Sequence, residues 1–138
     1  METGSCFPDT MLKELRDRCQ QDPRVAALYA FDLRGSGECN VAAVFTETPP
    51  WPERLELELA VARALQMERV ELINLRRMAL ISRYDVVNRG EPIYVGDPET
   101  LSIFIEETIA RYSAFYPLLE ALYWRVETKP LKSDMLPQ

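Results

Sequence analysis

The side chains that could carry out chemistry in this sequence are carboxylates, arginines and three cysteines, because the sequence contains no histidine. The absence of histidine excludes Ser-His-Asp and Cys-His catalysis as well as the His-Glu-x-x-His zinc site. Cys6, Cys19 and Cys39 are widely spaced and form no Cys-x-x-Cys pair, so they indicate neither a disulfide framework nor a zinc knuckle. With no histidine to activate its thiol, Cys39 is predicted to be a small buried hydrophobe rather than a nucleophile.

The other candidates for chemistry are Glu71 and the polar residues of one turn. Glu71 lies in an alternating apolar segment, where it is either a metal ligand or an ordinary acid on the exposed face of a strand. Arg34 and Gly35 belong to a turn, and Arg34 either contacts an anion or is simply solvated. Asp32 is more simply interpreted as a turn residue, whose carboxylate accepts hydrogen bonds from the backbone, than as a relocated catalytic acid.

Composition limits the classes of protein to which the chain could belong. Its 138 residues, 47% hydrophobic and 28% charged, suit one globular domain. The net charge of −6, with basic residues scattered among acids, argues against nucleic acid as a partner. No apolar stretch reaches the length of a membrane span, and the first ten residues do not form a secretory signal. We therefore expect a cytoplasmic protein that contacts no membrane.

The first half of the chain predicts a helix, a β-hairpin and a second helix. Residues 9–21 place apolar side chains at helical spacing before Asp22-Pro23 ends the pattern. Val25–Phe31 and Asn40–Phe45 are short apolar runs on either side of a glycine-containing turn, which is typical of paired buried strands. A proline-rich loop follows, and residues 53–66 carry one apolar stripe at helical spacing.

The next segments predict a third strand, a helix and a short edge strand. Residues 69–75 alternate between apolar and polar side chains, as a strand does. Residues 76–88 favour a helix, after which we expect Gly90 to adopt the left-handed conformation of a C-terminal cap. Residues 92–95 predict an edge strand, in which Pro92 is tolerated.

The last helix is predicted to be the longest, and to run from the cap at Asp97-Pro98 to about Val126. Its apolar residues cover more of its circumference than one buried stripe needs, which is typical of an interface. The alternative is a helix packed between the sheet and the preceding helix. We expect a single domain over residues 1–126 and a mobile tail over residues 127–138. The predicted interface residues are Tyr112, Tyr116, Leu119 and Tyr123.

From about residue 25 to residue 123, this order of elements resembles the minimal nucleotidyltransferases of the DNA polymerase β superfamily. In that family an apolar strand ends in Gly-Ser, an Arg-Gly turn follows, and the next strand carries an Asp-x-Asp pair. A third carboxylate lies on a later strand. The resemblance implies an α+β fold with a small mixed sheet, helices mainly on one side and a long C-terminal helix. The positions that match are Leu28-Tyr29, Arg34-Gly35, Glu71, Leu80, Gly90 and Tyr94.

The departures from the family pattern fall on its catalytic positions. Ala30 and Phe31 stand where the family has Gly-Ser, and Cys39 and Val41 stand where it has the two aspartates. Mg²⁺ prefers hard oxygen ligands, so a thiol and an isopropyl group cannot replace carboxylates. Glu71 then remains as a single metal ligand. Arg34 and Gly35 are the only residues that match the family at positions expected near a bound nucleotide. A second register, with Gly35-Ser36 as the Gly-Ser pair, is less consistent with the family pattern, because it leaves only Glu47 near the acidic positions.

The resemblance implies a partner as well as a fold, because such proteins are commonly encoded beside small helical HEPN proteins in antitoxin–toxin pairs. The active members transfer an adenylyl group from ATP to that partner. Without the aspartate pair, this chain is expected to act by binding, with no cofactor. The alternative is an active adenylyltransferase that uses Mg²⁺ and ATP with Glu71 and either Glu38 or Asp32. A more distant alternative is self-association through the long helix.

Overall fold

The central feature of the fold is an antiparallel pair of strands, β1 (Val25–Phe31) and β2 (Asn40–Phe45). The structure is a computed structural model that describes residues 7–32 and 37–132, without the side chains of 119 and 123–132. Both strands have the bounds that the sequence predicts, and their pairing confirms the predicted hairpin. Ala30 lies opposite Val41, and Phe31 lies opposite Asn40.

Two shorter strands complete a four-stranded mixed sheet in the order β3-β2-β1-β4. The strand β4 (Glu91–Val95) pairs antiparallel with β1 and forms one edge, as the sequence predicts. The strand β3 (Ile73–Asn74) pairs parallel with β2 at the other edge. The strand β1 is therefore hydrogen-bonded on both sides, and all seven of its residues are buried.

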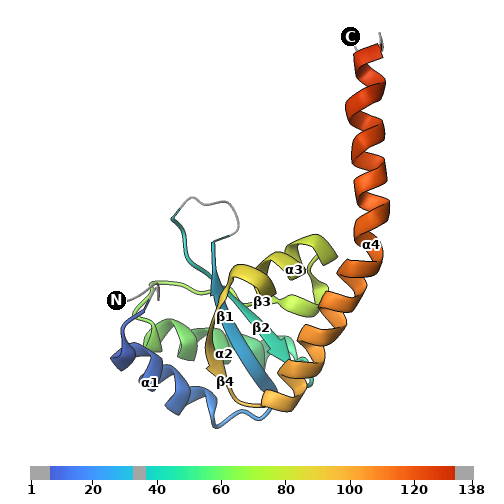
Figure 1. Ribbon diagram of the computed structural model, residues 1–138. Helices are drawn as coiled ribbons and strands as arrows, with labels where there is room; N and C mark the ends of the chain where they lie inside the picture. The colour runs from blue at the N-terminus through green and yellow to red at the C-terminus, as the bar shows by residue number, and fades with distance from the viewer. Residues whose placement is uncertain (1–6, 33–36, 133–138) are drawn as a thin grey trace.

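Helices cover both faces of the sheet (Figure 1). The helices α1 (Asp9–Cys19) and α2 (Trp51–Ala64) pack on one face, and α3 (Leu80–Arg89) and α4 (Pro98–Lys132) pack on the other. The expectation of helices mainly on one side is therefore wrong. The physical reason is visible in β1, since a strand whose side chains are apolar in both directions needs cover on both faces.

The predicted third strand over residues 69–75 is much shorter in the structure. Only Ile73–Asn74 joins the sheet, and a 3₁₀ turn, η1 (Leu75–Arg77), follows at once. Side chains of α2 take the place of a neighbouring strand at Leu72. Its N–H donates to Glu58 Oε2 at 2.9 Å, and its carbonyl accepts from Arg54 Nη2 at 2.5 Å. The backbone of Leu72 is thus satisfied without a ladder.

The start of α3 and the role of Gly90 also differ from expectation. The turn η1 occupies the first residues of the predicted helix, so α3 begins at Leu80 rather than at residue 76. Gly90 has φ −75° and ψ 164°, so the predicted left-handed cap is wrong. Glycine is required there for space instead, because an added Cβ would lie 2.5 Å from the carbonyl oxygen of Val86 and 3.3 Å from the ring of Tyr29.

The helix α4 begins on the body of the protein and then rises away from it (Figure 1). It continues to Lys132, past the predicted end near Val126, so part of the predicted tail is helical. Figure 1 also shows a change of direction in its middle part. The helix contains Pro117, which removes a backbone donor, and a proline inside a helix bends it. Within the described ranges, no helix combines the length and the hydropathy that a membrane span requires.

Candidate functional site

The position of the family's Gly-Ser pair lies at the end of β1 and is filled by buried side chains. Ala30 packs into the cluster under α1 and α2, whereas Phe31 packs into the cluster under α3 and α4. Both side chains are almost inaccessible to solvent, at 2% for Ala30 and 7% for Phe31. The end of the strand therefore offers a ring on one face and a methyl group on the other. It has no hydroxyl group, and its backbone is covered.

The three positions of the family carboxylates come together in space. Cys39, Val41 and Glu71 line one small cavity of about 140 Å³, which opens between β2 and the extended segment before β3. Arg69 lines the same cavity. The sequence reasoning placed these residues at equivalent positions from their order along the chain, and the structure brings them to one site. Val41 is buried, Cys39 is partly buried and Glu71 is exposed.

The donor set of this cavity does not fit a two-magnesium centre. Glu71 is the one carboxylate among the cavity's lining residues, beside the amide of Asn40, a thiol, an isopropyl group and the cation of Arg69. Two-metal phosphoryl transfer needs several hard oxygen ligands around the ions. In the described part of the chain, no three acidic, cysteine or histidine side chains are grouped closely enough to hold a metal ion.

The carboxylates proposed for a displaced site lie outside this cavity. Asp32 Oδ2 accepts a hydrogen bond of 2.6 Å from the backbone N–H of Gly37, which is the turn chemistry expected of it. Glu38 is exposed and does not line the cavity with Glu71. Arg34 and Gly35, the predicted nucleotide contacts, lie outside the described residues.

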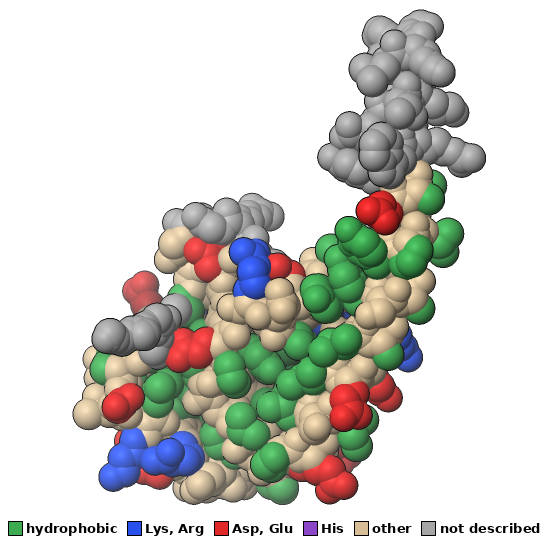
Figure 2. All heavy atoms as spheres, viewed as in Figure 1, with side chains coloured by type: hydrophobic (Ala, Val, Ile, Leu, Met, Phe, Trp, Pro, Cys, Tyr) green, Lys and Arg blue, Asp and Glu red, His purple; other side chains and the backbone are tan. Residues whose placement is uncertain are grey.

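The predicted interface on α4 divides into parts with different surroundings. Tyr112 is half-buried, and its ring stacks on that of Tyr84 from α3, so one of its faces stabilises the fold. Tyr116 is 45% exposed. The side chains of Leu119 and Tyr123 lie outside the described ones. Figure 2 shows hydrophobic side chains along the part of α4 that rises from the body. Among the described side chains of α4, the exposed large apolar ones are Ile103, Ile109, Tyr116, Leu118 and Leu122.

A second apolar surface was missed by the sequence reasoning. Trp51, Leu55 and Leu59 of α2 are exposed and line a cavity of about 540 Å³ beside the extended residues 68–71. Their spacing of four residues puts them on one face of the helix, and this spacing was the available signal. The signal is weak in the sequence because Trp51 follows two prolines, which favour a loop, whereas α2 begins at Trp51 itself.

The fold is similar to those of several solved toxin–antitoxin proteins. The toxin–antitoxin complex MntA–HepT contains a chain with a TM-score of 0.63 and 21% identity, and the match covers 88% of this chain and 100% of that one. A complex of a tri-AMPylated Shewanella oneidensis HEPN toxin with an MNT antitoxin gives a TM-score of 0.59 at 20% identity, covering 85% and 99%. A toxin–antitoxin structure with AMP-PNP gives 0.58 at 23% identity, covering 87% and 98%.

The sequence itself matches no model of a known protein family and no curated protein. The similarity therefore resides in the arrangement of strands and helices, over nearly the whole length of the matched chains. The mixed sheet with a long last helix is the fold that the sequence resemblance implies. This chain has the nucleotidyltransferase-like fold of the solved MntA proteins.

Proposed function

We propose that this protein is a catalytically degenerate minimal nucleotidyltransferase that acts by binding a HEPN-type helical toxin, with α4 as the contact. The degeneracy is supported by the donor set of the small cavity. Two of the three carboxylate positions hold Cys39 and Val41. A buried ring, Phe31, and Ala30 also stand where the family has the small Gly-Ser pair that lets a triphosphate approach the backbone. Loss of two metal ligands should reduce the rate by several orders of magnitude, since each ~1.4 kcal/mol is a factor of ten.

The observation that carries the binding role is the exposed apolar surface of α4. Leu118 and Leu122 are 62% and 52% exposed, and they follow Tyr112, whose ring stacks on Tyr84 of α3, along the helix. A helix without tertiary packing is marginally stable in water, so this segment gains most from a partner that covers it. Tyr116 suits such a contact, because a tyrosine ring buries a large area while its hydroxyl group stays paired or wet.

The identity of the partner is supported by the proteins that share the fold. Several solved structures with this fold are toxin–antitoxin structures, and in one of them an MNT antitoxin is in complex with a HEPN toxin. A specific interface of standard size buries about 800 Å² on each side, which the exposed apolar residues of one long helix can anchor. A helical partner also matches the shape of α4, since two helices pack with their side chains interdigitated.

The test begins with a search of the neighbouring genes for a short helical HEPN protein, and continues with co-purification of that protein and size-exclusion chromatography with light scattering. The double variant Tyr116→Asp, Leu122→Asp should abolish the complex, because it buries two unpaired charges in the contact. The matched control is Leu55→Asp, Leu59→Asp on α2, whose side chains have similar exposure, at 41% and 51%. The control should leave the complex intact.

Two outcomes would contradict the proposal. One is the absence of a complex between the unmodified chain and the neighbouring HEPN protein, or the absence of such a neighbouring gene. The other is a stable dimer of this chain alone that the α4 variant dissociates, since α4 would then serve self-association instead.

A further inference from the structure

Three arginines from three different elements lie close together between α3 and α4. Arg76 belongs to η1, Arg83 to α3 and Arg111 to α4. Nη2 of Arg83 donates to the carbonyl oxygens of Met78 at 3.2 Å and Arg76 at 3.4 Å, which holds its guanidinium against η1. The stacked rings of Tyr84 and Tyr112 bring the preceding residues of the two helices, Arg83 and Arg111, to the same level.

This arrangement concentrates positive charge in a protein that is acidic as a whole. Burial lowers the pKa of Arg83, and repulsion by Arg111 and then by Arg76 lowers it further. Glu107 is the nearby carboxylate that partly opposes this effect. The other charged groups thus leave Arg83 beside two like charges and one opposite charge. Such a cluster costs free energy in the absence of an anion.

Like the exposed Arg16, Arg63, Arg69 and Arg77, the three arginines lack the carboxylate partner that four other described arginines have, but Arg83 differs from those exposed residues in being partly buried. Arg18, Arg24, Arg54 and Arg89 each form an ion pair with a carboxylate. No ion pair is formed by Arg76, Arg83 or Arg111 with any described carboxylate, and Nε of Arg83 is buried without a hydrogen-bond partner there. A buried donor without an acceptor destabilises the folded protein. Both features indicate an anion that completes the cluster.

Arg76 is held in a fixed position for such an anion. Its Nε donates to the carbonyl oxygen of Phe45 at 3.3 Å, and its guanidinium lies over the ring of Phe104 at 5.2 Å from the centroid. These contacts fix the plane of the guanidinium and leave its terminal N–H groups available. Guanidinium groups held in this way recognise phosphate through paired hydrogen bonds.

We propose that Arg76, Arg83 and Arg111 form a binding site for a phosphate monoester, separate from the small cavity beside β2. Three positive charges and the negative charge of Glu107 sum to +2, which matches the charge of about −1.5 to −2 on a monoester at neutral pH. The binding of a partner to α4 is not required for this site. The ligand class is a dianionic phosphoryl group that three guanidiniums approach from η1, α3 and α4.

The experiment compares thermal unfolding in sodium phosphate with unfolding in sodium chloride at the same ionic strength and pH 7.5. For a dissociation constant near 1 mM, 20 mM phosphate should raise the Tm of the unmodified chain by roughly 3–6 °C. Arg111→Gln should remove this rise. Because it relieves repulsion, the same variant in chloride should melt at an equal or higher temperature than the unmodified chain.

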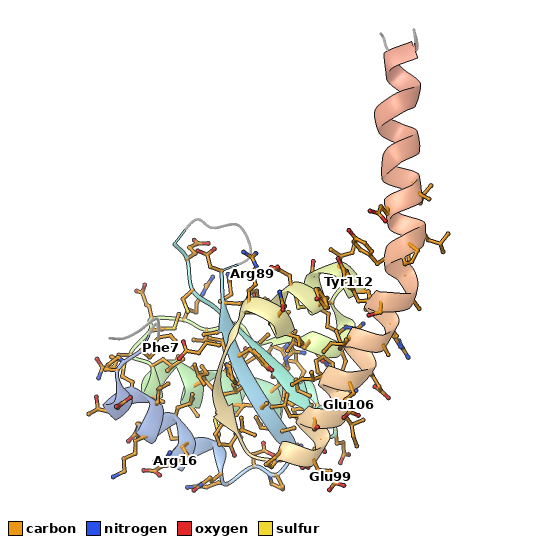
Figure 3. All side chains as sticks on the ribbon, in the orientation of Figure 1. Phe7, Arg16, Arg89, Glu99, Glu106 and Tyr112 are labelled. Atoms are coloured by element: carbon orange, nitrogen blue, oxygen red, sulfur yellow. The ribbon has the colours of Figure 1, made fainter. Side chains whose placement is uncertain are left out.

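The matched control is Arg16→Gln, which removes the same charge from an exposed position on α1. Figure 3 shows Arg16 on the opposite side of the molecule from Tyr112 and α3. This control should retain the full response to phosphate. A purely structural role for Arg111 predicts a lower Tm in chloride, and that result would overturn the proposal, as would equal loss of the response in both variants.

Two further ligands distinguish the sources of the phosphoryl group. Adenosine monophosphate carries a monoester and should stabilise the chain as phosphate does, with the Arg111→Gln variant again insensitive. A single-stranded oligonucleotide without terminal phosphates carries only singly charged diesters and should stabilise it far less at equal phosphorus concentration. Preferential stabilisation by the oligonucleotide would overturn the monoester assignment, and no response to phosphate would overturn the site.

Discussion

The rings of Tyr84 and Tyr112 are stacked in parallel, with centroids 3.8 Å apart and planes 5° apart. This pair joins α3 to the middle of α4, and Figure 3 shows Tyr112 on the side of α4 that faces α3. Tyr116 continues the aromatic series one turn later, at 5.8 Å from Tyr112 with a tilt of 41°. The series leads from a ring that stabilises the fold to a ring that is exposed.

Substitution Tyr112→Ala is expected to destabilise the protein by about 1–2 kcal/mol, because it removes a half-buried ring from the contact between α3 and α4. Urea unfolding measures this loss. A double-mutant cycle with Tyr84→Ala should give a coupling of about 0.5–1.5 kcal/mol, the usual value for an aromatic pair. Tyr116→Ala is the control and should cost less than about 0.5 kcal/mol. A coupling near zero would mean that the stack contributes nothing beyond burial.

Magnesium-ATP is expected not to bind with a dissociation constant below about 1 mM, because the buried Phe31 replaces a small residue of the family's Gly-Ser pair and the small cavity offers one carboxylate. Isothermal titration calorimetry measures this for the unmodified chain and for Glu71→Gln. Glu68→Gln, an exposed acid outside that cavity, is the matched control. Micromolar binding that depends on Glu71 would favour an active adenylyltransferase with displaced ligands.

Substitution Glu58→Ala is expected to cost about 1–3 kcal/mol, because it leaves the N–H of the buried residue Leu72 without an acceptor. Glu58→Gln keeps an acceptor oxygen at the same place and should cost clearly less. Urea unfolding of the two variants gives the comparison. Equal losses would show that the charge of Glu58, which lies 3.8 Å from Arg54 Nε, matters more than the hydrogen bond to Leu72.

Stability is expected to fall in acid partly through Asp22. Side-chain hydrogen bonds from Arg24 hold the pKa of Asp22 below its usual range, against the opposing effect of burial. A lowered pKa in the folded state stabilises the protein above the unfolded value of about 3.9, and this contribution is lost as pH falls through the folded value. Asp22→Asn should therefore be less stable at pH 7, by less than about 1 kcal/mol, and the two curves should converge below pH 4.

Acid unfolding followed by circular dichroism tests this prediction. Asp17→Asn on α1 is the control, since its exposed carboxylate forms no ion pair among those of the described residues. A variant Asp22→Asn that keeps a constant difference from the unmodified chain down to pH 2 would contradict the assigned role of the carboxylate.

The bounds of β1 and β2 could be predicted correctly because the apolar side chains of each strand span the same residues that pair in the sheet. Both are short apolar runs beside a turn, and a run that is apolar at every position suits only a strand covered on both faces. The same fact implied helices on both faces. The expectation of helices mainly on one face came from the family resemblance. It did not take into account that the side chains of β1 are apolar on both faces of the sheet.

The segment before β3 shows that alternation of apolar and polar residues is not enough to predict a strand paired in a sheet. Val70 and Leu72 are buried while Arg69 and Glu71 are exposed, as the alternation predicts. Alternation reports which way side chains point, and it does not report which groups satisfy the backbone. At Leu72 those groups are side chains of α2, 14 and 18 residues earlier in the chain. A local pattern cannot reveal such a partner.

The grouping at the small cavity could be predicted from the sequence, whereas the arginine cluster could not. The family resemblance placed Cys39, Val41 and Glu71 at equivalent positions, and the structure groups them around one cavity. The arginine cluster draws one residue from each of three elements, so no spacing along the sequence marks it. Its members become neighbours only when α3 and α4 pack.

The length of α4 beyond the Tyr84–Tyr112 stack makes the helix a lever arm. From Tyr112 to Lys132 the helix extends about 30 Å at 1.5 Å per residue. A tilt of about 5° at the stack would move the far end by roughly 2.6 Å, about half a helical turn. A partner that binds the far end of α4 therefore exerts a torque on the contact between α3 and α4. This torque acts on the stacked rings of Tyr84 and Tyr112 and on the arginines beside them.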